Sequence, residues 1–364
     1  MRLAPTAPTS NVFSVFNRMN PAAQKTVRFG LIGCGAWGIQ HASAIAKTPG
    51  AELAAIADSS EQSRETARTA YGKTVFYADY RQMLAREKLD VAAIVLPSHL
   101  HYEAAKASLA AGSHLLMEKP LCLRLDHCDE LITQANESGL LLAVVQQFRL
   151  SSLWGKIKEL VNEGAIGDPR YCLIDLWRNP FRLGTDGWRY DLSRSGSWIL
   201  EEAIHFFDLA RWYFEKAGDP VSVFASASHQ RNDRPELQDH FSATLQFPNG
   251  GYAVVSQTLG GYEHHMAVKM SGTKGALWAN WSGAMDRTLH PAFSLKYFDG
   301  KQVQDLPITR TPGEVFELED QLADMISAVR GAKLRGATGR DGRWAVEMCL
   351  KAQDSVKTGT LVRF

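Results

Sequence analysis

The sequence predicts an α/β protein with an N-terminal doubly wound parallel sheet and a C-terminal α/β domain carrying a large, mostly antiparallel open sheet. Up to residue 148 apolar runs alternate with helical segments, whereas later apolar runs follow one another through short turns. At 364 residues the chain is also longer than one typical core. We therefore expect an arm over 1–25, flexible or clasping a partner, a first domain over 26–148 and a second over 149–364.

The first element is a glycine-rich turn between a buried strand, 27–32, and a helix, 39–47. Gly33 permits the tight turn, Gly35 lets backbone approach a pyrophosphate, and Gly38 lets the helix pack on the strand. The helix N-terminus adds N–H donors and partial positive charge for phosphates. This order predicts a Rossmann domain that binds a dinucleotide through Gly33, Gly35, Ala36, Trp37 and Gly38.

Asp58 indicates which dinucleotide is bound. It ends a second apolar run, twenty positions after Gly38. A carboxylate at this position accepts hydrogen bonds from the ribose hydroxyls of NAD and would repel the 2′-phosphate of NADP. We expect NAD, although Ser59, Ser60 and Arg64 leave some room for NADP.

The remaining runs of the first domain continue the parallel pattern. We expect helices over 60–71, 79–86, 101–111 and 125–138, and strands over 90–96, 114–117 and 140–145. Ligands of such sheets bind beyond the carboxyl ends of the strands. The residues there that we expect to face the cofactor are Pro97, Ser98, His101, Glu118 and Lys119.

The second domain begins with a bridging helix over 152–163, and strands then dominate. The expected strands are 170–177, 221–228, 241–247, 251–258, 266–271, 276–281 and 293–298, and the expected helices are 199–215, 317–330 and 340–358. Short links between strands indicate antiparallel pairing. Helices cover one face of such a sheet, so we expect a second copy to cover the other, in a homodimer or homotetramer.

Two segments carry candidate chemistry. Lys119 could hydrogen-bond a substrate hydroxyl and stabilise negative charge on its oxygen. On the predicted helix Glu201, His205 and Asp208 occupy positions i, i+4 and i+7 of one face. An imidazole beside a carboxylate suits a general base. A histidine satisfied in the core is the alternative.

Together, the glycine turn 33–38, the Glu118-Lys119-Pro120 tripeptide and the helix containing His205 resemble the Gfo/Idh/MocA oxidoreductase family, relatives of glucose–fructose oxidoreductase and inositol dehydrogenase. The resemblance covers residues 26–358 in order and includes the segments 97–101, 165–169 and 272–275. It implies an open-sheet second domain and oligomers built on that sheet. It also implies that Lys119 and His205 assist alcohol oxidation with hydride passing to nicotinamide.

Two positions depart from the family pattern. Glu201 stands where relatives commonly have Asp, and Ala203 where they commonly have Gly, so no familiar substrate transfers directly. We expect His205 to take the hydroxyl proton and Glu201 to orient it or bind a hydroxyl. The cleft between the domains is expected to be lined by Gln147, Arg149, Trp188 and Arg189.

The family resemblance, together with these residues, implies an NAD-dependent dehydrogenase or reductase acting on a sugar, polyol or related compound. The same residues could instead support redox-neutral glycoside cleavage through transient oxidation and elimination. A non-catalytic, nucleotide-binding regulator is the third possibility, which the presence of Lys119 and His205 disfavours.

Bulk composition excludes several other classes. With 40 basic and 39 acidic residues, the net charge of +1 gives no electrostatic basis for binding nucleic acid or anionic membranes. No apolar run approaches the length of a membrane span. Five cysteines without metal-ligand spacing suggest reduced thiols in a cytoplasmic protein. His264-His265 and Asp239-His240 alternate across strand faces, so we expect no metal site.

Overall fold

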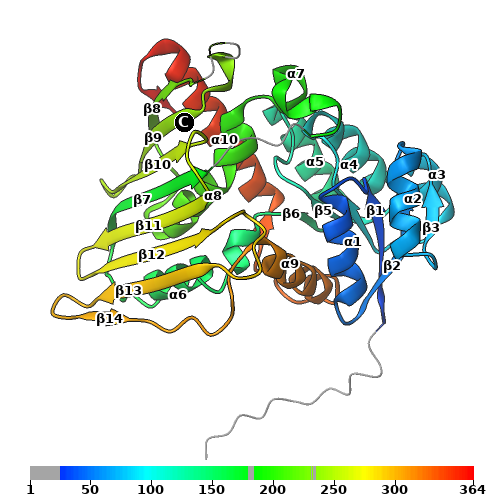
Figure 1. Cartoon of the computed structure of the whole chain (residues 1–364), viewed down its shortest axis with the longest axis horizontal. Coiled ribbons are helices and arrows are strands. Elements are labelled where there is room, and N and C mark those ends of the chain that lie inside the picture. The colour runs from blue at the N-terminus through cyan, green and yellow to red at the C-terminus, as the bar shows by residue number, and fades with distance from the viewer. Residues whose placement is uncertain (1–24, 179–183, 231, 233–234) are drawn as a thin grey trace, which may run out of the picture.

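The computed structural model describes residues 25–178, 184–230, 232 and 235–364, which form two sheets lying side by side (Figure 1). The arm predicted over 1–25 lies outside the described residues except for Lys25. The first sheet has seven strands in the order β15-β6-β5-β4-β1-β2-β3, and the second has nine in the order β14-β13-β12-β11-β7-β10-β9-β8-β16. The predicted combination of a Rossmann sheet and a mostly antiparallel sheet is confirmed.

Six strands of the first sheet are parallel: β1 (Val27–Ile32), β2 (Ala51–Ala57), β3 (Val75–Tyr77), β4 (Val91–Ile94), β5 (His114–Met117) and β6 (Leu142–Val144). The strand order reverses between β1 and β4, which creates the crevice where open α/β sheets bind ligands. The seventh strand, β15 (Ala337–Thr338), pairs antiparallel with β6 and comes from near the end of the chain. The sequence pattern did not predict this strand.

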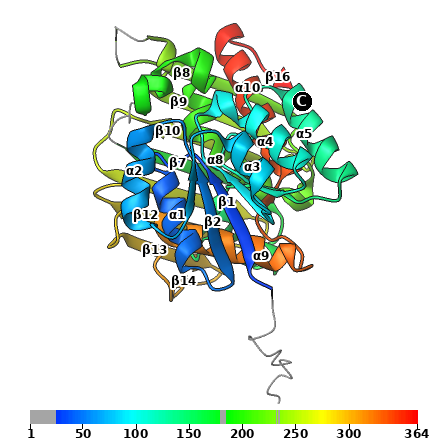
Figure 2. The same ribbon diagram turned by 90° about the vertical axis from the view of Figure 1, so that its right-hand side faces the viewer.

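Helices cover both faces of the first sheet (Figure 2). One face carries α1 (Gly38–Lys47) and α2 (Glu61–Ala70), and the other carries α3 (Tyr80–Arg86), α4 (His101–Ala110) and α5 (Leu125–Glu137). A later helix, α9 (Glu314–Val329), joins α1. Its Leu318, Leu322 and Met325 pack in one core with Phe29 and Leu31 of β1. The first sheet is therefore completed by residues from the far end of the sequence.

The second sheet consists of β7 (Pro169–Arg178), β8 (Ser222–Ser228), β9 (His240–Gln246), β10 (Tyr252–Thr258), β11 (His264–Gly272), β12 (Ala276–Gly283), β13 (Ala292–Phe298), β14 (Val303–Asp305) and β16 (Val362–Arg363). All neighbours are antiparallel except β7 and β10. Three helices lie behind it in Figure 1: α6 (Trp154–Asn162), α8 (Ile204–Tyr213) and α10 (Gly339–Thr358). Among the described residues, no helix combines the length and apolar character needed to cross a bilayer.

Candidate active site

The glycine turn has the geometry that a dinucleotide requires. Gly33 has φ +94°, and a Cβ there would lie 2.2 Å from the Val95 carbonyl oxygen. A Cβ on Gly38 would lie 2.1 Å from the carbonyl oxygen of Gly33. A Cβ on Gly35 would meet no atom of the described part of the chain within 4 Å, so those residues leave this side of the turn open. The residues present therefore fit a pyrophosphate lying over Gly35 at the start of α1.

Asp58 lies at the end of β2, beside this turn. Its Oδ2 accepts a 2.7 Å hydrogen bond from the Cys34 amide, and its Oδ1 accepts one of 2.8 Å from the Ser60 amide. Each oxygen keeps a second lone pair for a ribose hydroxyl. The Arg64 side chain donates to the Asp58 carbonyl oxygen and pairs with Glu61, so its charge is already compensated. This arrangement favours a ribose without a 2′-phosphate.

The Glu118 carboxylate contacts the glycine turn and the first turn of α1. Its Oε1 accepts from Trp37 Nε1 at 2.8 Å and lies 2.9 Å from His41 Nε2, while its Oε2 accepts from the Lys119 amide at 3.1 Å. Burial raises the pKa of Glu118, but its contacts with His41 and Lys119 outweigh that effect and lower the pKa to about 2. The ionised carboxylate thus anchors the indole of Trp37, which was predicted to contact the cofactor.

Lys119 connects the first domain to the helical segment that carries His205. Its Nζ donates a 2.5 Å hydrogen bond to the Glu201 carbonyl oxygen and lies 3.7 Å from Glu201 Oε1. Arg189 Nη2 lies 3.1 Å from the same carboxylate oxygen. The neighbouring Glu202 pairs with Arg178 at 2.8 Å. The Lys119 ammonium therefore lies at the boundary of the two domains, near both acidic and basic side chains.

The His205 side chain contacts Gln146, which lies two residues after the end of β6. The Nδ1 atom of His205 lies 2.6 Å from Gln146 Oε1. An amide oxygen only accepts hydrogen bonds, so Nδ1 carries the proton and Nε2 keeps its lone pair. Burial and the nearby Lys119 cation lower the pKa of His205 to about 3, against smaller opposite effects of Glu118 and Glu202. The ring is therefore neutral near pH 7, with its Nε2 lone pair available.

The prediction that Glu201 shares one face with His205 and Asp208 is wrong for Glu201, whereas His205 and Asp208 both face the segment after β6. The segment Ile199–Ala203 (η5) is a π-helix, which widens the turn before α8 and changes the angular spacing of the side chains. Glu201 is directed to Lys119 and Arg189, and Asp208 to Arg149. The expected orienting role of Glu201 toward His205 is therefore not what the structure contains.

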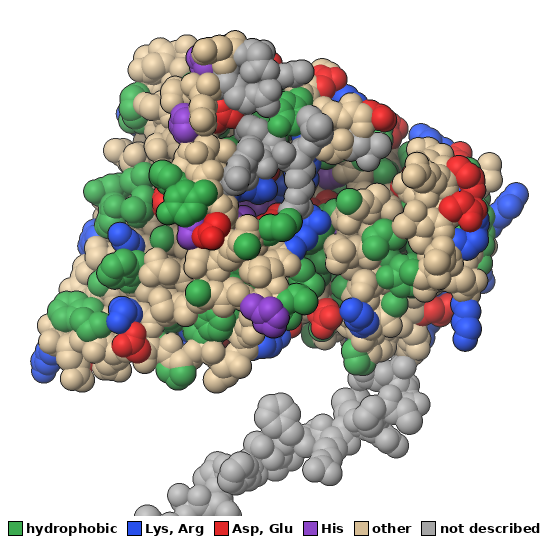
Figure 3. Space-filling model, viewed as in Figure 1, with side chains coloured by type: hydrophobic (Ala, Val, Ile, Leu, Met, Phe, Trp, Pro, Cys, Tyr) green, Lys and Arg blue, Asp and Glu red, His purple; other side chains and the backbone are tan. Residues whose placement is uncertain are grey.

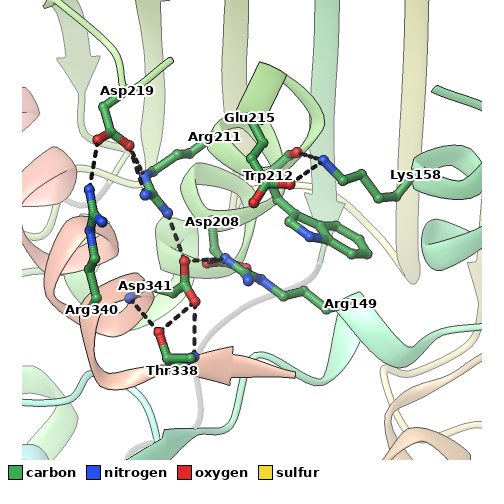
Figure 4. A network of polar contacts seen from close by, with 10 residues as sticks. All are labelled: Arg149, Lys158, Asp208, Arg211, Trp212, Glu215, Asp219, Thr338, Arg340 and Asp341. Carbon is green, nitrogen blue, oxygen red and sulfur yellow. Dashed lines mark hydrogen bonds and ion pairs between the residues drawn. The ribbon is translucent and has the colours of Figure 1, made fainter. Parts of the chain in front are cut away.

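Arg149 and His101 also differ from the prediction. Arg149 binds both oxygens of Asp208 at 2.7 Å and lies 3.2 Å from Asp341, in a buried network where it is 7% exposed (Figure 4). It stabilises the fold instead of facing a substrate. His101 is fully buried, and both ring nitrogens contact carbonyl oxygens, of Pro120 and Leu96, at 2.7 and 2.9 Å. It ties together the loops after β4 and β5 and has no nitrogen left for a cofactor.

The other predicted residues lie around these contacts. Pro97 and Ser98 follow β4 at the ligand-binding edge, where Ser98 begins the short helix η2 (Ser98–Leu100). Gln147 begins η3 (Gln147–Leu150) and is 3% exposed. Trp188 lies in η4 (Thr185–Tyr190), with the Arg189 guanidinium carbon 5.4 Å from its ring centroid. The contact of Pro97 and Ser98 with the cofactor, and that of Gln147 and Trp188 with a substrate, stay predictions.

No local sequence pattern indicated several residues that contact the site. Gln146 stands beside the predicted Gln147, and nothing in the pattern tells which of the two amides points to the histidine. Arg178 ends β7, and its partner Glu202 adjoins the predicted Glu201. Arg287 lies in the loop after β12, with its guanidinium carbon 4.1 Å from the Trp37 ring centroid. These contacts join segments distant in sequence, which no local signal connects.

The comparisons with known proteins agree with this architecture. Residues 27–146 match the model of the Gfo/Idh/MocA oxidoreductase family with an NAD-binding Rossmann fold, and residues 154–278 match a C-terminal domain of the same family. Relatives include 1,5-anhydro-D-fructose reductase of Ensifer adhaerens, 23% identical over 91% of this chain and 97% of that protein. Inositol 2-dehydrogenase of Rhizobium meliloti is 28% identical over 70% of this chain and 76% of its own length.

Solved structures share the fold. Aldose–aldose oxidoreductase of Caulobacter crescentus superposes with a TM-score of 0.81 at 19% identity, over 94% of this chain and 100% of that one. The WlbA dehydrogenase of Bordetella pertussis, solved with NADH and UDP-GlcNAcA, gives 0.79 at 23% identity, over 93% and 98%. Both domains of this chain match the family models in order, and the glycine turn fits NAD. The chain therefore belongs to the Gfo/Idh/MocA family of NAD-binding oxidoreductases.

Proposed function

We propose that this protein is an NAD-dependent dehydrogenase or reductase that interconverts a hydroxyl and a carbonyl group of a sugar, a polyol or a sugar derivative. The observation that carries the proposal is a neutral imidazole, His205, held beside the Lys119 cation at the boundary of the two domains. Relatives named as inositol, apiose and anhydrofructose enzymes support the substrate class.

His205 and Lys119 have separate roles in the proposed reaction. When bound, NAD supplies a nicotinamide ring that accepts or returns a hydride. Nε2 of His205 accepts the proton of the substrate hydroxyl, because the proton on Nδ1 is already donated to Gln146. The Lys119 ammonium stabilises negative charge on the same oxygen. The mostly buried Lys119 and His205 keep this exchange away from bulk water.

The decisive experiment is an NADH absorbance assay with NAD and a panel of polyols, aldoses, uronic acids and glycosides, with product analysis alongside. We expect NADH to accumulate with one substrate group. Glycoside cleavage without net NADH would support the redox-neutral cycle instead. Tight NAD binding without either reaction would support a regulator and contradict the proposal.

Asp58 provides a test of cofactor choice. Asp58→Ser removes the negative charge that opposes a 2′-phosphate, so we expect the ratio of Kd values, NADP over NAD, to fall at least about tenfold. The lost hydrogen bond to Cys34 weakens the turn for both cofactors and cancels in the ratio. Titration calorimetry measures both constants, with Asp354→Ser on α10 as the control. An unchanged ratio would show that Asp58 does not select the cofactor.

We also propose that the molecule forms a homodimer or homotetramer through the uncovered face of the second sheet. The strand register places Phe224, Leu173 and Trp278 in one row across this face. Phe224, Tyr252, Trp177 and Trp278 are 41–47% exposed. Figure 3 looks onto this face and shows hydrophobic patches among scattered charges. Such a large sheet surface favours association with an identical sheet.

A charge placed on this face should prevent that association. We expect Trp278→Glu combined with Tyr252→Glu to convert the oligomer to a monomer, because burying two carboxylates without partners is unfavourable. Light scattering after gel filtration gives the mass, and NAD binding confirms that the variant is folded. Wild-type protein that is already monomeric at high concentration would refute the proposed interface.

The five cysteines support a cytoplasmic location for this enzyme, which we propose with it. All five are buried and none is in a disulfide. Burial raises the pKa of Cys34 to about 12, so its thiol stays protonated despite its place in the glycine turn. Such thiols suit a reducing compartment.

A further inference from the structure

We propose that Gln146, rather than a carboxylate on the helix of the histidine, positions His205 so that its Nε2 faces the substrate. This inference rests on the proposed function, in which His205 accepts the substrate proton. Gln146 acts through the histidine and is thus a positioning residue. Because its amide is uncharged, Gln146 does not stabilise the protonated form of His205.

Two polar pairs dock the segment after β6 onto α8. The Gln146 amide oxygen lies 2.6 Å from His205 Nδ1, and three residues later Arg149 binds both oxygens of Asp208 at 2.7 Å. The partners on α8 are also three residues apart, so the two pairs run in the same register. A bidentate guanidinium–carboxylate contact resists rotation and sliding. The Arg149–Asp208 pair therefore keeps Gln146 in position against His205. Figure 4 shows this second pair at the centre of its network.

The carboxylates near His205 on the chain are engaged elsewhere. Glu201 contacts Lys119 and Arg189, and Glu202 contacts Arg178 at 2.8 Å. The π-helix Ile199–Ala203 separates these side chains from the face of α8 that meets Gln146. Gln146 is therefore the side chain that determines the tautomer of His205.

An uncharged partner has a chemical consequence. The charged groups acting on His205 are Lys119, which opposes its protonation, and Glu118 and Glu202, which favour it less strongly. The Phe148 ring, 5.2 Å away, adds no compensating charge. Among the residues that the structure describes, none provides a counterion bonded directly to an imidazolium formed at this site, so the proton that it accepts must pass on quickly. Neutral histidine is then the resting state over the working pH range.

Two variants of Gln146 test this inference. Gln146→Glu puts a carboxylate in contact with Nδ1, and we expect it to raise the pKa of His205 by about one to three units. The acid limb of the pH profile of kcat/KM should move upward by the same amount. Gln146→Met removes the acceptor, and we expect a mixture of tautomers with kcat lowered roughly ten- to hundredfold and KM nearly unchanged. Gln82→Glu, on the exposed face of α3, is the control.

Nitrogen-15 NMR of histidine-labelled protein reads both the tautomer and the titration of His205 directly. Wild-type protein should contain the Nδ1–H tautomer and stay neutral to at least about one unit below the free-histidine pKa. An equal titration in wild type and Gln146→Glu, or an unchanged tautomer in Gln146→Met, would overturn the inference. The spectra require no turnover. If the spectra are as expected but the protein shows no activity with any substrate, the proposed function is refuted. The role of Gln146 in setting the tautomer of His205 still holds in that case.

Discussion

Replacing His205 with leucine should lower kcat by about 10²- to 10⁴-fold, the usual contribution of a positioned general base. The Nε2 atom of the imidazole is available, and the pKa of about 3 keeps the ring neutral throughout the neutral pH range. Leucine fills similar space but cannot take the proton. Steady-state kinetics on the substrate identified by the panel gives kcat, and calorimetry should give a nearly unchanged Kd for NAD.

Lys119→Met provides the companion measurement. Removal of the ammonium should lower kcat by a similar factor, because charge on the substrate oxygen loses its stabilising partner. Lys106→Met, which removes a lysine of an exposed pair with Glu130, controls for loss of a positive charge and should keep full activity. Activity within a few fold of wild type in both His205→Leu and Lys119→Met would contradict the assignment of the site.

The second large effect concerns stability. Asp208→Asn should lower the free energy of unfolding by about 3 kcal/mol, since it leaves the buried Arg149 guanidinium without its main counterion. Asp341, 3.2 Å from Arg149, compensates part of that charge, which keeps the loss at the lower end of the usual range. Urea denaturation followed by tryptophan fluorescence measures the change.

A double variant separates the buried charge from the packing. Arg149→Met combined with Asp208→Leu removes both charges and should recover most of the stability lost in Asp208→Asn. The same double variant should lower kcat, because the docking of Gln146 on His205 loses its neighbouring pair. A double variant less stable than Asp208→Asn would mean that the hydrogen-bonded pair itself, and not the stranded charge, dominates the energetics.

The sequence was most informative where one local pattern has one physical solution. A strand, Gly33, Gly35, Gly38 and a helix in that order leave little alternative to the observed turn, and Asp58 follows at the end of the next strand. Continuous apolar runs likewise predicted the buried parallel strands. Lys119 could be placed because residues after parallel strands share one edge of the sheet.

The rest depended on contacts between distant segments. The π-helix before α8 has no clear sequence signature, so helical spacing placed Glu201 beside His205 and not beside its actual partners Lys119 and Arg189. Arg149 looked available as a cleft residue, because the sequence does not show that Asp208 lies opposite it. Two-residue strands such as β15 are too short to give a period. The parallel pairing of β7 with β10 also has no local signal.

The contribution of α9 to the first sheet constrains the order in which the protein can be made. Leu318, Leu322 and Met325 cover apolar side chains of β1, yet they are translated almost 300 residues after them. A nascent chain that has just emerged through β6 therefore displays an uncovered apolar surface. It lacks β15 at the sheet edge as well. The nucleotide-binding half therefore completes its core and its sheet edge only after α9 and β15 have been made, and until then it exposes the kind of apolar surface that makes folding intermediates prone to aggregation.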